Sequence, residues 1–385
     1  MLYRELGKTG EKVSILGLGT MRLPVIDGDN EKIDVEKAEE ILKYGIDNGI
    51  NYVDTAYPYH GNSLDKGGMS EIVVGNFLEK GYRDKVLLAT KLPTWLVSKK
   101  EDFEYYLNEQ LKRLKTDYFD IYLVHDVNKT VWPMLVDLGL FEYLDKIKED
   151  GKVKYIGFSF HDDLDLFLEV MDSYDWDVVQ TQMNYLDTAY ESGLTGLQYV
   201  SSLNIGNIVM EPLRGGSLVN NISPDIEDLW NSSEVKRSPA EWAFRYLYDM
   251  EEVDIVLSGM TTLEQLKENL DIAERGTVNS LSKKDHKLIE EVTLALKSKK
   301  MNGCTECGYC MPCPEGVDIP TCLKEYNRAM MFVDANAVDV SRYYYDVDEN
   351  SNASKCNECK TCIPLCTQQL NIPEELKKVK KVFGR

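Results

Sequence analysis

Cysteine is missing from the first 303 residues of this 385-residue chain, and all nine cysteines lie between residues 304 and 366. The absence excludes a disulfide framework over most of the chain. Dispersed cysteines would suggest disulfides in a secreted protein, whereas cysteines concentrated in one segment of a cytosolic chain indicate metal ligation. The last part of the chain is therefore predicted to bind metal.

Long apolar runs and a surplus of positive charge are also missing. No run approaches the roughly 20 apolar residues of a membrane-spanning helix, and residues 1–5 lack the apolar core of a signal peptide. With 44 Lys and Arg against 65 Asp and Glu, the formal charge of −21 argues against nucleic acid and anionic membranes as partners. We therefore expect a cytoplasmic protein that binds neither.

What the sequence does contain is a regular alternation of apolar runs and amphipathic stretches. This alternation predicts βα units and a parallel sheet. Eight repeats favour an α/β fold of the closed (β/α)8 TIM barrel type over a doubly wound sheet. The predicted strands are Val13–Leu18, Tyr52–Asp54, Val86–Thr90, Phe119–Val124, Val153–Phe158, Val178–Gln182, Ile208–Met210 and Ile255–Leu257.

The length of the chain exceeds the about 250 residues of one barrel and leaves room for a small second domain. We predict a barrel over residues 1–298, with a polar hairpin over residues 1–12 at its bottom, and a small, mainly α-helical domain over residues 299–385. One barrel helix is expected over Met134–Glu149. Further helices are predicted at Lys283–Lys297, which would lie across the barrel, and at Pro320–Met331 and Pro373–Val382.

Polar side chains stand at the carboxyl ends of three successive predicted strands. Asp54 ends the second strand and Tyr59 follows it, Lys91 follows the third strand, and His125 follows the fourth. In a parallel barrel these ends lie on one face, where active sites are built. Each residue alone could be an ordinary solvated strand end, but four in this order and register favour one shared site.

The pattern Asp-x-Ala-x-x-Tyr, with a strand-end Thr-Lys and a strand-end His, resembles the catalytic tetrad of the aldo/keto reductases. The resemblance covers roughly residues 1–298 and implies reduction of a small carbonyl substrate, or oxidation of an alcohol, with NAD or NADP. Tyr59 would donate the proton and Lys91 would lower the pKa of the phenol. Asp54 would hold Lys91 in place, and His125 would position the substrate oxygen.

The same resemblance implies that later strand ends hold the cofactor. Ser159 and Gln180 match residues that hold the nicotinamide amide, and Asn184 lies in the matching turn. The loop of residues 211–216 matches the segment that covers the pyrophosphate, where glycines let backbone amides approach phosphates. The residues expected along the pyrophosphate and the adenosine are Pro212, Leu213, Gly215, Gly216, Gly259, Gln265, Glu268 and Asn269.

Three positions depart from the family pattern. Phe160 follows the fifth strand where the family often has Asn, and Met210 stands where a Tyr often stacks on the nicotinamide. Gly259 and Gln265 stand where a 2′-phosphate usually meets Lys or Arg. The choice between NAD and NADP is therefore open, and we expect little preference for NADP.

Several other His, Tyr, Trp and Asp side chains lie outside these motifs. His60 and His286 are interpreted as surface residues. Four side chains that follow strand ends are expected either to line the substrate pocket or to pack within loops: Tyr57, Trp95, Asp126 and His161.

The nine cysteines form two runs and one separate residue. The runs are Cys304-x2-Cys307-x2-Cys310-x2-Cys313 and Cys356-x2-Cys359-x2-Cys362-x3-Cys366. Three cysteines at this spacing hold three corners of a cubane, and a distant residue supplies the fourth ligand. Two zinc sites are the alternative, although structural zinc usually takes paired Cys-x2-Cys knuckles. Cys322 lies outside the pattern and is interpreted as a core residue of a helix.

These runs resemble the dicluster domains of α-helical ferredoxins, and a tail of this kind marks a recognisable aldo/keto reductase subfamily. In two-cluster ferredoxins the fourth cysteine of each run binds the other cluster. The resemblance therefore implies two 4Fe-4S clusters. The ligand sets would be Cys304, Cys307, Cys310 and Cys366 for one cluster, and Cys356, Cys359, Cys362 and Cys313 for the other.

Three interpretations follow for the whole chain. The first is an aldo/keto reductase type of oxidoreductase whose clusters exchange single electrons with a redox partner protein. The second is an iron–sulfur electron-transfer protein whose barrel is only a scaffold for a ligand or a partner. The third keeps the reductase and makes the clusters structural. The four strand-end residues favour the first, whereas Met210 and Phe160 keep the second open.

Overall fold

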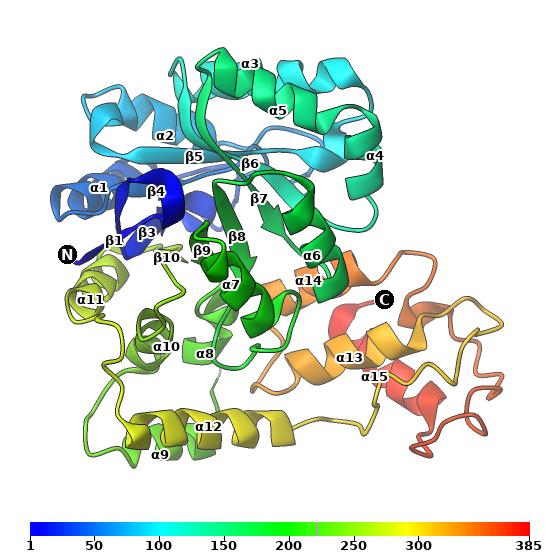
Figure 1. The fold of residues 1–385 in the computed structure, drawn as a ribbon. Helices are drawn as coiled ribbons and strands as arrows, with labels where there is room; N and C mark the ends of the chain where they lie inside the picture. Colours follow the sequence, from blue (N-terminus) through cyan, green and yellow to red (C-terminus); the bar gives the residue numbers. More distant parts are fainter. Residues whose placement is uncertain (221) are drawn as a thin grey trace. The chain divides into compact units, whose positions relative to one another are not determined.

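The computed structural model describes residues 1–220 and 222–385, and its central element is a closed barrel of parallel strands (Figure 1). The strands are β3 (Leu16–Gly19), β4 (Tyr52–Asp54), β5 (Leu87–Leu92), β6 (Phe119–Val127), β7 (Val153–Phe160), β8 (Val178–Gln182), β9 (Gly206–Met210) and β10 (Ile255–Ser258). They pair in sequence order, and β10 closes the barrel on β3. The predicted (β/α)8 barrel is confirmed.

The first predicted strand, Val13–Leu18, is wrong as a single element. Its first part belongs to β2 (Lys12–Ser14), which pairs antiparallel with β1 (Tyr3–Glu5), and only its second part enters the barrel as β3. The apolar run is continuous because both parts are buried. Leu6 and Val13 pack with Tyr52 and Ile121 at the amino-terminal ends of the barrel strands. The hairpin therefore closes the bottom of the barrel, as predicted.

Amphipathic helices alternate with the strands. They are α1 (Val35–Asp47), α2 (Ser70–Leu78), α3 (Lys100–Leu114), α4 (Trp132–Asp137), α5 (Leu140–Glu149), α6 (Leu164–Ser173), α7 (Gly193–Ser202), α10 (Pro239–Tyr248) and α11 (Leu263–Glu274). The single helix predicted over Met134–Glu149 is wrong. Gly139 takes a φ of 83° between α4 and α5, and a left-handed residue interrupts a helix.

The chain forms two compact units. The first is Met1–Pro212 together with Glu241–Leu281, and the second is Leu213–Ala240 together with Ser282–Arg385. The limits of these units do not coincide with residue 298, and the domain boundary after that residue stays a prediction. Among the helices of the described residues, none combines the length and the apolar character that crossing a bilayer requires.

The second unit is built from helices. They are α8 (Ser217–Asn220), α9 (Pro224–Asn231), α12 (Lys283–Ser298), α13 (Ile319–Ala329), α14 (Ala337–Asp346) and α15 (Ile372–Phe383). Helices α12, α13 and α15 correspond to predicted helices, whereas α14 was not predicted. Residues 299–385 were expected to be mainly α-helical; they contain α13, α14 and α15 and no strand in the described part, while both cysteine runs lie in loops and turns.

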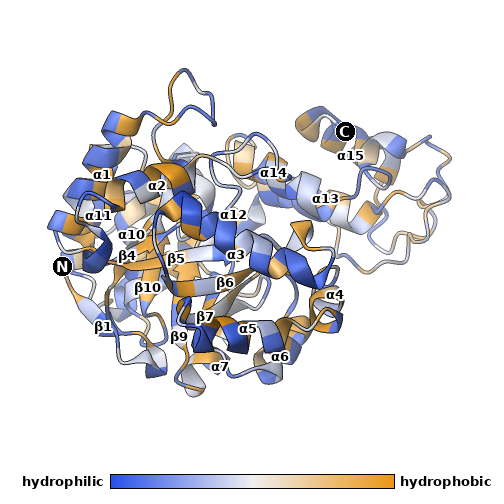
Figure 2. Ribbon diagram, turned by 90° about the horizontal axis from the view of Figure 1, so that it is seen from above, coloured by the Kyte–Doolittle hydropathy of each residue, from blue (hydrophilic) through white to orange (hydrophobic). Residues whose placement is uncertain are grey.

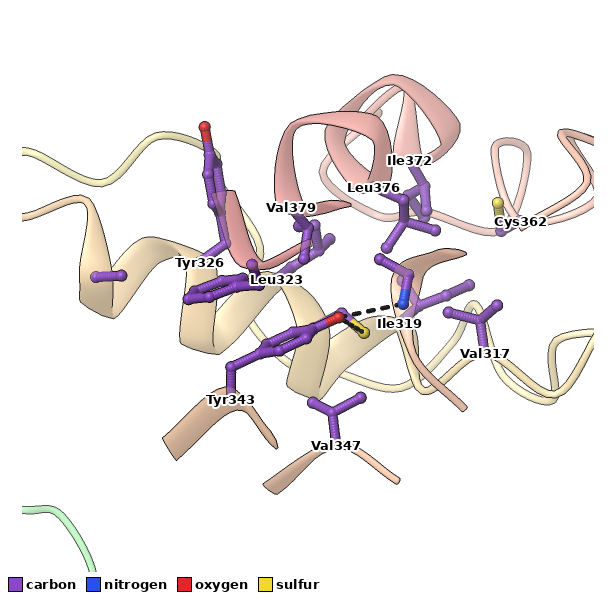
Figure 3. Close-up of a cluster of buried hydrophobic side chains, with 14 residues drawn as sticks. Val317, Ile319, Leu323, Tyr326, Tyr343, Val347, Cys362, Ile372, Leu376 and Val379 are labelled. Atoms are coloured by element: carbon purple, nitrogen blue, oxygen red, sulfur yellow. Dashed lines mark hydrogen bonds between the residues drawn. The ribbon is translucent and has the colours of Figure 1, made fainter. Parts of the chain in front are cut away.

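The core of the second unit joins α13, α14 and α15 (Figure 3). The ring of Tyr343 stacks on Phe383 with centroids 4.2 Å apart, and its hydroxyl oxygen accepts a hydrogen bond of 3.2 Å from the Ala353 amide. The sulfur of Cys322 lies 3.5 Å from the same hydroxyl and is fully buried. The prediction that Cys322 is a core residue is confirmed.

Candidate active site

Lys91 is the centre of a polar cluster at the carboxyl ends of β4 and β5. Its Nζ donates hydrogen bonds to both carboxylate oxygens of Asp54, at 2.7 and 2.8 Å, and to the carbonyl oxygen of Thr55 at 2.9 Å. The same nitrogen lies 3.2 Å from the hydroxyl oxygen of Tyr59. The Lys91 side chain is fully buried, so its charge depends on these partners. The structure therefore brings together three of the four residues expected to be catalytic.

A buried histidine fixes the turn that carries Tyr59. His60 was interpreted as a surface residue, and that prediction is wrong. Its Nε2 accepts a hydrogen bond of 3.0 Å from the Leu23 amide, and its Nδ1 lies 3.0 Å from the carbonyl oxygen of Asn30. The imidazole thus bridges segments that are distant in sequence, which the local pattern does not reveal. His286 is exposed, as predicted.

The pKa of Tyr59 depends on burial as well as on Lys91. Burial raises the pKa of the Tyr59 phenol above its ordinary value, and the ammonium of Lys91 offsets only part of this increase. The lowering effect expected of the Lys91 ammonium is present, but the effect of burial is larger. Burial alone would lower the pKa of Lys91, but Asp54 and Tyr59 outweigh this effect and the pKa is raised. At neutral pH the cluster thus holds a protonated phenol beside an ammonium.

His125 reaches the same end of the barrel from β6. Its ring centroid lies 6.1 Å from that of Tyr59 and 5.2 Å from that of Trp95. Burial lowers the pKa of His125 well below its ordinary value, and the charges of Lys91 and His161 lower it further. Its Nδ1 is buried and has no hydrogen-bond partner within the described residues. The imidazole is therefore neutral and has a polar atom available for a ligand.

Three other residues after strand ends make contacts within the described residues, and their role at a substrate pocket stays a prediction. Tyr57 packs edge-on against Tyr106 of α3. Trp95 lies against His125, and its Nε1 donates to the carbonyl oxygen of Leu64 at 2.9 Å. The amide of Asp126 donates to the Ser159 hydroxyl at 3.1 Å.

His161 carries a positive charge close to this cluster. Its Nδ1 lies 3.2 Å from Oε1 of Glu191, and its side chain is 24% exposed. Burial would lower its pKa, but the carboxylate of Glu191 outweighs this and raises the pKa to about 9. An imidazolium at neutral pH near the neutral His125 does not follow from the sequence pattern.

The two residues expected at the nicotinamide are neighbours. Ser159 of β7 pairs with Gln180 of β8 in the sheet. The Oε1 atom of Gln180 is buried without a hydrogen-bond partner in the described part of the chain, and its Nε2 lies 3.4 Å from the sulfur of Met210. Asn184 instead stabilises its own turn, because its Oδ1 accepts from the amides of Leu186 and Asp187. An unpartnered amide oxygen fits a hydrogen-bond donor such as a carboxamide group.

The residues expected at the adenosine lie around the start of α11. Gln265 caps this helix, since its Oε1 accepts from the amides of Thr261 and Thr262. Asn269 donates to the Ser258 hydroxyl at 3.1 Å, and Glu268 is exposed on the same helix.

Sequence reasoning missed Arg22. A Cβ atom on Gly259 would lie 3.2 Å from the Arg22 side chain, and the hydroxyl of Thr261 donates to the Arg22 carbonyl oxygen. Arg22 is exposed. Its signal in the sequence is its place directly after the first barrel strand, the kind of position that pointed to the other site residues.

In the loop of residues 211–216 expected at the pyrophosphate, Pro212 belongs to the first unit, whereas Leu213, Gly215 and Gly216 belong to the second unit. Within that unit the guanidinium of Arg214 donates to Asp339 at 3.0 Å and is 4% exposed. Gly215 has a φ of 64°, and a Cβ atom there would lie 2.4 Å from Val338. Glycine is therefore required by packing against α14. The role of this loop in cofactor binding stays a prediction.

The eight cysteines of the two runs line two cavities in the second unit. The first cavity is lined by Cys304, Cys307, Cys310 and Cys366. The second is lined by Cys313, Cys356, Cys359 and Cys362. Ile319 lines both. In the described residues, no group of three or more His, Cys, Asp or Glu side chains converges as a single metal ion requires.

Comparison with known proteins identifies the family. Residues 15–293 match the model of the aldo/keto reductase family, which ends before the first cysteine. The chain is 29% identical to L-galactose dehydrogenase of Arabidopsis thaliana over 325 residues, with 77% of this chain and 95% of that protein covered. It is 27% identical to NADH-specific methylglyoxal reductase of Escherichia coli (strain K12) over 340 residues, which cover 76% and 98%.

A solved structure supports the same assignment. The holo form of aldo-keto reductase AKR11C1 from Bacillus halodurans matches with a TM-score of 0.62 and 25% identity, over 76% of this chain and 96% of that one. The chain therefore belongs to the aldo/keto reductase family and is an NAD(P)-dependent oxidoreductase.

Proposed function

We propose that the protein reduces a small carbonyl compound, or oxidises the corresponding alcohol, at the cluster of Asp54, Tyr59, Lys91 and His125. The contact of the Lys91 ammonium with both Asp54 and Tyr59 is the observation that supports this most. A bound nicotinamide ring supplies or accepts the hydride. The residues of the chain supply the proton and hold the substrate oxygen.

Tyr59 is the proton donor in this proposal. Hydride addition leaves negative charge on the substrate oxygen, which needs a proton in the transition state. The raised pKa of Tyr59 keeps the proton on the phenol at neutral pH. When the proton leaves, the ammonium of Lys91 at 3.2 Å stabilises the phenolate, and Asp54 keeps that ammonium in place. The neutral His125 is the hydrogen-bonding partner of the substrate oxygen.

Gln180 and Ser159 are proposed to hold the nicotinamide amide. The buried and unpartnered Oε1 of Gln180 fits the NH2 group of that amide. Arg22 beside Gly259 supplies a cation near the expected adenosine end, where Gly259 and Gln265 supply none. Both NAD and NADP are therefore compatible with the residues present.

The substrate is proposed to be small and polar. Two of the similar proteins are named after L-galactose and methylglyoxal, which carry hydroxyl or carbonyl groups close together. Trp95 lies against His125, and the charged pair of His161 and Glu191 is close to it. These side chains are proposed to line the substrate pocket.

We also propose that the cysteine segment holds two 4Fe-4S clusters that pass single electrons. The support is that each cavity is lined by one of the two ligand sets expected from the sequence. A zinc ion would need its sulfurs at about 2.3 Å from one point, whereas a cubane places a separate iron at each cysteine. Sulfurs that surround a cavity suit the second arrangement.

One preparation tests both parts of the proposal. Protein purified without oxygen should contain about eight irons and eight sulfides per chain. The same sample should bind NAD or NADP in a fluorescence titration and reduce small dicarbonyls. Stoichiometric zinc without sulfide would contradict the clusters, and wild-type turnover after loss of the Tyr59 hydroxyl would contradict the barrel chemistry.

A further inference from the structure

Helix α15 presents a row of exposed lysines. Its apolar side chains Ile372, Leu376, Val379 and Phe383 are buried in the core of the second unit. Figure 2 shows hydrophilic and hydrophobic residues alternating along this helix. Lys377, Lys380 and Lys381 are spaced three and four residues apart, so they share the opposite, exposed side.

The end of the chain, residues 355–385, carries a net positive charge, whereas the rest of the chain carries a net negative charge. Residues 355–385 hold seven Lys and Arg against three Glu, while residues 1–354 hold 37 basic and 62 acidic residues. Lys380 and Lys381 make no ion pair within the described residues, and the same holds for Lys360 in the second cysteine run. A basic area on an acidic protein attracts acidic partners that the remaining surface repels.

The basic area, which consists of Lys360 and the exposed lysines of α15, adjoins the second cysteine cavity. Lys360, Pro373 and Leu376 line that cavity together with Cys359, which is exposed. Lys377 joins α15 to the cysteine run through an ion pair of 2.8 Å with Glu358. Leu365, next to the last cysteine of the run, is 48% exposed. Exposed apolar side chains contribute to the centre of protein interfaces.

We propose that Lys360, Lys380 and Lys381 form the docking surface for an acidic one-electron carrier protein, which exchanges electrons through the group in the second cavity. This inference rests on the proposed function, because it requires the iron–sulfur cluster. In each event the reduced carrier loses one electron and the cluster in the second cavity gains it, so that the carrier is oxidised and the cluster is reduced by one electron.

A membrane surface is the other ligand that exposed lysines on a helix can bind, but the structure favours a protein. Membrane-surface helices insert an apolar face among the lipids. The apolar face of α15 is already buried against α13 and α14, as Val379 and Leu376 show in Figure 3. The residues of α15 that are exposed are charged: Glu374, Lys377, Lys378, Lys380 and Lys381.

The test is a binding measurement with matched variants. A flavodoxin of net negative charge is the probe, and the anaerobically purified full chain is compared with the triple variant Lys360→Gln, Lys380→Gln, Lys381→Gln. The control triple variant is Lys283→Gln, Lys284→Gln, Lys287→Gln, which removes the same charge from exposed positions of α12 in the same unit. Iron and sulfide are assayed in every sample.

We expect the dissociation constant to rise roughly tenfold at low salt in the first triple variant, and by less than about twofold in the control. The difference in dissociation constant between the wild type and the first triple variant should decrease at high salt, because salt screens exposed charges. If iron and sulfide are present, an equal loss of affinity in both triple variants, or no loss of affinity in either, overturns the proposed docking surface. Lysine-dependent binding to phosphatidylserine vesicles, without binding to flavodoxin, overturns it in favour of a membrane. Samples without iron and sulfide overturn the proposed clusters as well.

Discussion

The Nζ of Lys91 lies 3.2 Å from the hydroxyl oxygen of Tyr59, a residue 32 positions away in the sequence. Burial keeps the phenol protonated, and the ammonium beside it stabilises the phenolate that remains after proton transfer. The phenol therefore carries the proton that the substrate oxygen needs, and the adjacent ammonium stabilises the phenolate that forms when the proton is transferred. This relationship is the basis of the first two predictions.

Replacement of Tyr59 by Phe should lower the rate of carbonyl reduction by roughly 100- to 10,000-fold, the typical contribution of a positioned proton donor. Binding of NAD should be nearly unchanged, because the phenol oxygen is expected to contact the substrate. Steady-state kinetics and a nicotinamide titration on the same sample check both parts. A variant with wild-type turnover would support the barrel as a mere scaffold.

Replacement of Lys91 by Met should lower the rate of carbonyl reduction by a comparable factor and shift the pH dependence of the reaction. Lys91 lowers the pKa of Tyr59, so its loss raises that pKa further. Alcohol oxidation needs the phenolate as a base, and its optimum should therefore move to higher pH. The pH profile of alcohol oxidation measures the shift. An unchanged profile would show that Lys91 does not affect the pKa of the group that titrates.

Cys310→Ala should remove one cluster and lower the iron content from about eight to about four per chain. Cys322→Ala is the matched control, because Cys322 is buried in the core and lines neither cavity. Its iron content should equal that of the wild type. Iron and sulfide assays measure both variants, and an equal loss in the two would point to a general folding defect.

Arg22→Ala should weaken NADP binding more than NAD binding. A charge-assisted hydrogen bond to a 2′-phosphate contributes about 1.5–3 kcal/mol, which corresponds to roughly ten- to hundredfold in the dissociation constant. NAD lacks this phosphate and is the internal control. Equal weakening of both cofactors would place Arg22 at a group that the two share, such as the pyrophosphate.

His161 should make stability fall at alkaline pH. Its folded-state pKa of about 9 exceeds the ordinary value of about 6.5, because Glu191 stabilises the imidazolium. A raised pKa stabilises the fold fully below about pH 6.5, and this stabilisation is lost as the pH rises through about 9. Denaturant unfolding should therefore show a wild-type decline, on the order of 1–3 kcal/mol, that His161→Gln lacks. Parallel pH curves for the two proteins would contradict the charged pair.

The sequence by itself determined the barrel, the strand ends that carry Asp54, Lys91 and His125, and the spacing of the cysteine runs. These features are local: the period of apolar residues defines a strand, and its last residue is placed by the strand direction. The interruption between α4 and α5, which the sequence-based prediction missed, also has a local cause, the left-handed Gly139. The division of Val13–Leu18 between hairpin and barrel was hidden because both parts are equally buried.

Only the tertiary structure decided which distant groups meet. Burial of His60 between two loops, the approach of Arg22 to Gly259, and the raised pKa of Tyr59 each depend on residues far apart in the chain. The grouping of one cysteine of a run with three of the other is an exception, because the resemblance to dicluster ferredoxins already implied it and the linings of the two cavities follow it. The physical reason is that desolvation and charge interactions depend on distance in space, whereas a sequence pattern reports only the neighbours along the chain.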